Sequence, residues 1–131
     1  MTTAPGRGPA EPFFLRRGVG QRFCLYHPPA GKCRGAVLYL HPFAEELNRT
    51  RRMAALQSRA LAEHGFAVLQ LDLHGCGDSG DDFRDARWDG WKDDVAAASR
   101  WIEQRCGLVP ALWGLRLGAL LALDYAAAAQ R

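Results

Sequence analysis

The chain has 131 residues, of which 48% are hydrophobic and 24% are charged, as expected for a globular protein with a single core. Its formal net charge of +3 is small, and its densest basic cluster, Arg49, Arg51 and Arg52, has acidic residues nearby, so the charge pattern does not favour a nucleic-acid partner. The sequence has no signal-peptide core and no run of roughly 20 apolar residues, which predicts a cytoplasmic protein without a membrane span.

The first segment, residues 1–11, is rich in Pro, Gly and Thr, and we expect it to be a flexible tail. Residues 12–131 are expected to form one partial domain. This domain begins with two short β-prone runs at 13–15 and 23–26. The link between them is short and contains glycine, which predicts an antiparallel hairpin.

The apolar run 35–40 predicts a strand that is buried on both faces. A polar loop over 41–48 follows it. Thr50 is then placed to cap a helix that continues to about His64, with Gly65 as its C-terminal stop.

The run 66–73 predicts a second buried strand, which leads into a glycine-rich loop. Apolar residues at helical spacing predict a helix from Trp88 or Asp89 to Cys106, and Gly107 would end it. A strand at 109–113 and a helix to about Ala128 complete the chain. The order β-β-β-α-β-α-β-α indicates an α/β fold: a mostly parallel sheet with flanking helices and an N-terminal antiparallel hairpin.

In such a sheet the loops at the carboxyl ends of the strands share one crevice, so the loops at His41, Asp72 and Gly114 are expected to converge. The run Gly114-Leu115-Arg116-Leu117-Gly118 matches the layout of a nucleophile elbow, G-x-S-x-G, in which a strand-to-helix turn exposes one side chain. Here that side chain is Arg116. An arginine stays protonated and only donates hydrogen bonds, so it cannot attack a carbonyl carbon.

A cation in the first turn of a helix is disfavoured by roughly 0.3–1 kcal/mol when it is exposed, so Arg116 should have an offsetting partner. One candidate is an ion pair with Glu45 or Glu46, which lie in the loop expected to face it. The other is an anionic ligand, a carboxylate or phosphate, held by the guanidinium and nearby backbone N–H groups. We favour the internal pair, because two acids are available in that loop.

An oxyanion hole would need backbone donors in these same loops. Phe43 or Ala44 is the first candidate and Leu117 the second, whereas Pro42 has no N–H to donate. His41 is a candidate binding residue. Its alternative role, which we favour, is that of a turn residue hydrogen-bonded to the backbone.

Asp72 is expected to be a structural hydrogen-bond acceptor, in a loop whose glycines permit a tight turn. Cys76 or Ser79 could serve as a nucleophile only with an adjacent base, and the sequence places none beside them. The four cysteines lack zinc-site spacing. We therefore expect reduced thiols, no metal site and no cofactor.

Three loops carry a resemblance to a known family: HPFAEELN (41–48), DLHGCGDS (72–79) and WGLRLGA (113–119). In this order and at these distances, the chain from about Pro12 resembles the N-terminal half of the α/β-hydrolase superfamily. The loops look most like those of the hydrolase 2 group associated with exosortase A systems. Those bacterial proteins are encoded beside a protein-sorting and exopolysaccharide machinery.

The resemblance implies an ester or acyl hydrolase whose nucleophile precedes its acid and its histidine in the chain. The acid and histidine would follow the elbow, yet the sequence ends at Arg131. We therefore expect the C-terminal half of the fold to be absent and this form to be inactive. A homo-oligomer or the missing half would cover the open sheet edge. The alternative is a non-catalytic accessory protein that binds a small anionic or acyl group through Arg116.

Overall fold

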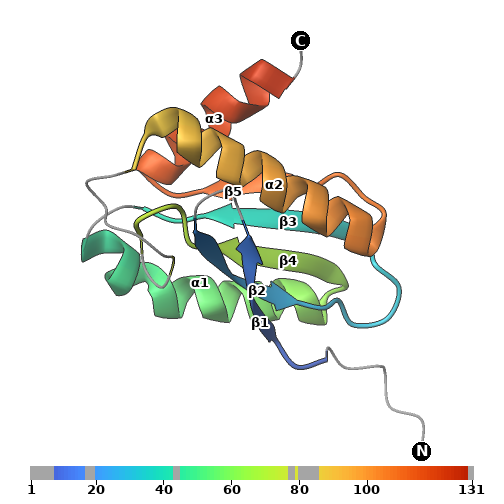
Figure 1. The fold of residues 1–131 in the computed structure, drawn as a ribbon. Coiled ribbons are helices and arrows are strands. Elements are labelled where there is room, and N and C mark those ends of the chain that lie inside the picture. The colour runs from blue at the N-terminus through green and yellow to red at the C-terminus, as the bar shows by residue number, and fades with distance from the viewer. Residues whose placement is uncertain (1–7, 17–19, 43–44, 77–78, 80–85, 130–131) are drawn as a thin grey trace, which may run out of the picture.

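The computed structural model describes residues 8–16, 20–42, 45–76, 79 and 86–129, apart from the side chains of Glu45, Glu46 and Ala129. Its element order is the predicted β-β-β-α-β-α-β-α (Figure 1). The elements are β1 (Glu11–Arg16), β2 (Gln21–His27), β3 (Gly35–Leu40), α1 (Glu45–Glu63), β4 (Phe66–Leu71), α2 (Trp88–Cys106), β5 (Ala111–Gly114) and α3 (Leu117–Ala129).

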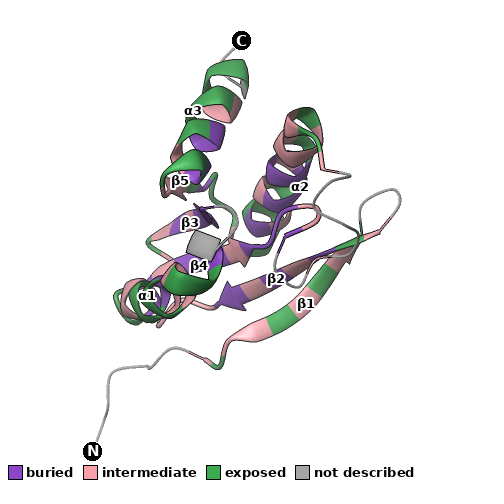
Figure 2. Ribbon diagram, turned by 90° about the vertical axis from the view of Figure 1, so that its left-hand side faces the viewer, coloured by how far each residue is buried: buried purple, intermediate pink, exposed green. Residues whose placement is uncertain are grey.

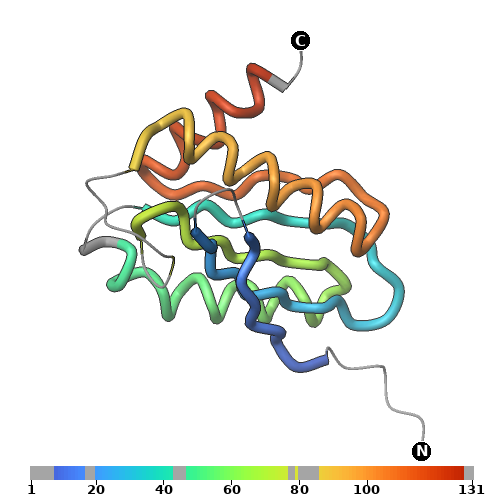
Figure 3. The backbone as a smooth tube through the Cα atoms, viewed as in Figure 1, coloured from blue at the N-terminus to red at the C-terminus, as the bar shows by residue number. Residues whose placement is uncertain are grey.

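The strands form one sheet in the order β1-β2-β4-β3-β5. The predicted hairpin is confirmed: β1 and β2 pair antiparallel, with Phe13 opposite Cys24. β2 is also antiparallel to β4, whereas β3 is parallel to both β4 and β5. The carboxyl ends of β3, β4 and β5 therefore meet at one edge of the sheet, as the backbone path in Figure 3 shows.

Helix α1 covers one face of the sheet, and α2 and α3 cover the other (Figures 1 and 2). On the α2 face, apolar side chains form a fully buried cluster that includes Leu38, Leu69 and Ile102. The α1 face is more polar, with His27 Nε2 hydrogen-bonded to Gln70 Oε1 at 2.6 Å. None of the helices in the described ranges is long and apolar enough to cross a membrane.

Helix α1 begins at Glu45, five residues before the predicted cap, so the expectation that Thr50 starts the helix is wrong. Leu47 is only 7% exposed, and its burial adds one turn to the face that packs on the sheet. Acidic residues are also favoured in the first turn by the helix dipole. Thr50 lies inside the helix, where its hydroxyl donates a hydrogen bond to the Leu47 carbonyl.

The later elements follow the predictions closely. Helix α2 ends at Cys106, and Gly107, which follows it, is left-handed (φ 81°) and donates its N–H to Glu103 O at 2.7 Å. Strand β5 begins at Ala111 rather than at residue 109. Pro110 has no N–H to give to a sheet, and Val109 is 73% exposed.

Candidate functional site

The turn between β5 and α3 places Arg116 at its apex. Arg116 has φ 56°, a left-handed conformation that residues other than glycine rarely adopt. The turn closes through hydrogen bonds from Gly118 N to Leu115 O and from Ala119 N to Arg116 O, both 2.9 Å. The Arg116 side chain is exposed, as a residue at the apex of a sharp strand-to-helix turn would be.

Two glycines on either side of the apex allow this turn to form. A Cβ at Gly114 would lie 2.6 Å from Ala119 N, inside the first turn of α3. A Cβ at Gly118 would overlap Leu40 O and would lie 2.6 Å from His41 O. The start of α3 therefore packs against the backbone at the end of β3, which brings the loops after β3 and β5 together.

His41 joins the loop after β3 to the loop after β4. Its Nε2 accepts a hydrogen bond from Leu73 N at 3.1 Å, and its Nδ1 therefore carries the proton and donates to Pro42 O at 2.7 Å. The ring is 1% exposed, and this burial lowers its pKa. The geometry favours the structural role of His41, because both ring nitrogens are engaged with the backbone.

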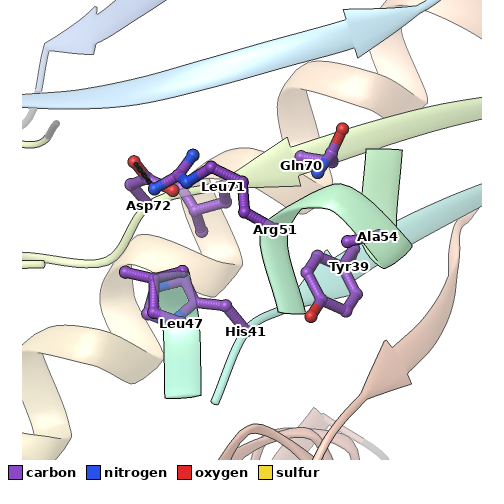
Figure 4. A pocket seen from close by; sticks show the side chains of 8 residues that line it. All are labelled: Tyr39, His41, Leu47, Arg51, Ala54, Gln70, Leu71 and Asp72. Carbon is purple, nitrogen blue, oxygen red and sulfur yellow. Dashed lines mark hydrogen bonds and ion pairs between the residues drawn. The ribbon is translucent and has the colours of Figure 1, made fainter. Parts of the chain in front are cut away.

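Asp72, at the end of β4, accepts a hydrogen bond from Arg51 of α1 at 3.2 Å (Figure 4). The pocket drawn in Figure 4 has a volume of about 10 Å³. That volume suits a single water molecule at most. The pocket is therefore too small for a substrate. The hydrogen bond from Arg51 to Asp72 joins α1 to the sheet.

Ser79 and Cys76 are the alternative nucleophiles in the loop after β4, and neither is suited to attack. The Ser79 hydroxyl donates to Asp72 O and accepts from Phe23 N at 2.9 Å, so it ties this loop to β2. Cys76 is 6% exposed, and burial together with the nearby carboxylates of Asp72 and Asp94 raises its pKa to about 12. Its thiol therefore stays protonated near neutral pH.

A buried ion pair that the sequence reasoning missed supports the same loop. Asp94 of α2 accepts one hydrogen bond from Arg22 Nε at 3.0 Å and another from His74 N at 2.9 Å. Trp91 Nε1 adds a bond to His74 O at 2.9 Å. Two signals pointed to the pair: Arg22 shares a strand face with the buried Cys24, and Asp94 lies on the apolar face of the helix.

The remaining predicted site residues are only partly placed. Leu117 is the first residue of α3, where backbone N–H groups have no acceptor inside the helix. Phe43 and Ala44 lie outside the described residues. Glu45 and Glu46 are the first two residues of α1, but their side chains lie outside the described part, so the ion pair with Arg116 stays a prediction.

Residues 31–131 match the family model for serine aminopeptidase, S33. The chain is also 30% identical over 108 residues to Protein ABHD12B of Homo sapiens, an alignment that covers 82% of this chain and 28% of ABHD12B.

Solved structures of α/β hydrolases share the fold. XC6422 of Xanthomonas campestris, an α/β serine hydrolase without lid, superposes with a TM-score of 0.73 at 24% identity, over 92% of this chain and 57% of XC6422. A thermostable carboxyl esterase of Bacillus coagulans has a TM-score of 0.73 at 22% identity, over 92% of this chain and 41% of the esterase. The chain thus spans about half the length of these solved relatives.

Proposed function

Because the chain belongs to the serine aminopeptidase S33 family of α/β hydrolases, we propose that it is a hydrolase-fold protein with an arginine at the nucleophile position and no serine-type catalysis. The observation that carries the proposal is the conformation of Arg116. It occupies the left-handed apex of a turn whose two flanking glycines fit against backbone, the arrangement expected of a nucleophile elbow.

An arginine side chain at that position is unsuited to ester cleavage. A guanidinium has no lone pair that is basic near neutral pH, so it cannot form an acyl intermediate. The described residues of the neighbouring loop offer no substitute, since the Ser79 hydroxyl bridges two backbone groups and the Cys76 thiol is buried and protonated. Among the residues that the structure describes at this edge of the sheet, hydrogen-bond donors remain and a nucleophile does not.

Turnover of an activated ester tests the proposal. We expect the purified chain to release p-nitrophenol from p-nitrophenyl acetate no faster than its Arg116→Ala variant does, and a fluorophosphonate probe to label no residue. Faster turnover by the parent chain, lost in Arg116→Ala, would overturn the proposal. Labelling that maps to Ser79 would overturn it as well.

Anion binding is the second candidate function. Arg116 is exposed and directly precedes α3, where the helix dipole and the Leu117 N–H favour negative charge. Titration calorimetry with acetate and with inorganic phosphate should give heat that Arg116→Gln abolishes. Arg52→Gln, which changes an exposed arginine of α1, is the matched control and should leave the heat unchanged. Equal heats from all three proteins would exclude this function.

The setting in which the protein acts is also a proposal. The similarity of its three loops to the exosortase A-associated hydrolase 2 group supports a role beside a protein-sorting and exopolysaccharide machinery. Sequencing the genes on either side of the coding region tests this. An exosortase gene in the same cluster is the expected result, and a cluster without any sorting or exopolysaccharide gene would contradict it.

A further inference from the structure

Helix α1 is the only helix in the described ranges that covers its face of the sheet, so its outer side faces solvent (Figures 1 and 2). Four residues at positions i, i+3, i+4 and i+7 of this helix surround a hollow: Arg52, Ala55, Leu56 and Arg59. Together with Arg51 they line a groove of about 550 Å³, which we call the arginine groove. Along the helix, Ala55 and Leu56 lie in its middle and the two outer arginines lie at its ends.

The described residues do not compensate the positive charge of the arginine groove. Arg51 is paired with Asp72 at 3.2 Å, whereas Arg52 and Arg59 have no ion-pair or hydrogen-bond partner in the described part of the chain. Both are exposed, and the helical rise places their backbones about 10 Å apart along the axis. Two cations therefore flank an apolar centre, in which Leu56 is 50% exposed.

The spacing of the groove residues suits a helix as the binding partner. In coiled coils, a side chain of one helix inserts into a hole formed by four residues of the facing helix, and charged residues beside the seam set the choice of partner. The groove has this form, because residues three and four apart are neighbours on a helix surface. An apolar side chain fits between Ala55 and Leu56, and carboxylates on either side of it can pair with the two guanidinium groups.

From this charge complementarity we propose that the arginine groove docks an acidic amphipathic helix of another protein, with one apolar side chain in the hollow and a carboxylate at each end. A second copy of α1 is unsuitable, because it would bring arginine against arginine. Acetate or phosphate alone would meet a single exposed guanidinium, where one ion pair contributes little. The groove therefore suits a ligand that carries two carboxylates and an apolar group.

Fluorescence anisotropy with a labelled synthetic peptide is the direct test. The peptide consists of heptads with leucine at both core positions and glutamate at both flanking positions, and in the matched probe lysine replaces every glutamate. We expect the full chain to bind the glutamate peptide and not the lysine peptide, and added salt to weaken the binding. Equal binding of both peptides, or no binding of the glutamate peptide, would overturn the proposal.

Variants of the groove test its charge and its shape separately. Arg52→Glu and Arg59→Glu should each weaken binding about fivefold, the upper end of what an exposed ion pair contributes. Ala55→Phe keeps every charge and fills the hollow, so it should weaken binding as well, with circular dichroism as the check that it is folded. Arg100→Glu, at an exposed position of α2, makes the same change in net charge and should bind like the parent. Equal losses in Arg100→Glu and Arg52→Glu would show that net charge alone attracts the peptide, which contradicts the proposal.

An anionic lipid surface is the alternative ligand for exposed arginines. Vesicles of phosphatidylglycerol and phosphatidylcholine are sedimented with the parent chain and with Arg52→Glu. We expect both proteins to stay in the supernatant. Sedimentation of the parent with the vesicles, lost in Arg52→Glu, would assign the groove to a membrane surface instead of an acidic helix.

Discussion

Gly118 illustrates how little space the turn leaves for a side chain. A methyl group there would overlap Leu40 O, so Gly118→Ala must push the start of α3 away from β3. Overpacking of this kind costs about 1–3 kcal/mol and sometimes more. We expect Gly118→Ala to lower the free energy of unfolding by at least that amount, measured by urea denaturation.

Gly90 is the matched control for this prediction. It lies in the first turn of α2, and a Cβ there would meet nothing within 4 Å. Because alanine is the better helix former by about 1 kcal/mol, Gly90→Ala should leave the protein as stable or more stable. Similar losses at both glycines would mean that the close approach at Gly118 is not what limits that position.

His41 should make stability depend on pH. Burial lowers its pKa below the ordinary 6.5, so the folded state resists protonation that the unfolded chain accepts. The unfolded state then binds more protons than the folded state does. His41 therefore does not reduce the free energy of unfolding above about pH 6.5, and that free energy falls as the pH drops below this value. Urea denaturation at a series of pH values from about 7 to 5 should show this decline.

His41→Gln removes the titrating group and should flatten that decline, although it lowers stability overall by disturbing the bonds to Pro42 O and Leu73 N. His64→Gln, an exposed histidine at the end of α1, should keep the decline of the parent protein. If His41→Gln retained the full pH dependence, another group would have to account for it.

At the level of elements, the Arg22–Asp94 pair joins β2 to α2 and holds the loop after β4. The two side chains are 7% and 2% exposed. Removing one partner of a buried pair leaves an uncompensated charge and costs about 3–5 kcal/mol. Asp94→Ala should therefore lower the free energy of unfolding by an amount in that range, measured by urea denaturation.

Two variants make this measurement specific to the pair. Asp93→Ala changes the adjacent exposed carboxylate and should alter stability by no more than about 0.5 kcal/mol. Combining Arg22→Met with Asp94→Ala removes both charges and should recover part of the loss. A double variant no more stable than Asp94→Ala would show that the buried charge of Arg22 is not the source of the cost.

The elements were predictable because their signals are local. Continuous apolar runs marked β3 and β4, and Gly65 and Gly107 marked helix ends. The start of α1 was missed because the contact that fixes it, the burial of Leu47 against the sheet, joins distant residues. The same reason explains why only part of the candidate site was predictable from the sequence. The convergence of its loops follows from strand order, but the engagement of His41 with Leu73 and of Asp94 with Arg22 depends on side-chain packing.

On the scale of the whole molecule, the sheet has an unpaired edge at β5. In the described part of the chain, β5 pairs only with β3, and the adjacent α3 exposes Leu120 and Leu123 by 55% and 68% (Figure 2). Exposed apolar surface beside an unpaired strand edge favours association. We expect the chain to self-associate in a concentration-dependent way in sedimentation velocity experiments.

Charges on α3 should weaken that association. Leu120→Lys and Leu123→Lys should each shift the chain toward a monomer at a given concentration. Leu56→Lys changes a leucine of similar exposure (50%) on α1 and should leave the distribution unchanged. Monomeric behaviour of the parent at every concentration, or an equal effect of Leu56→Lys, would contradict this prediction.

In the turn around Arg116, the residues that fix the backbone are different from the residue that presents its side chain to solvent. The close contacts of the turn are made by Gly114 and Gly118 with backbone atoms, while the apex side chain extends outward. A substitution at the apex would therefore change the chemistry of the exposed side chain and leave the steric fit of the two glycines intact.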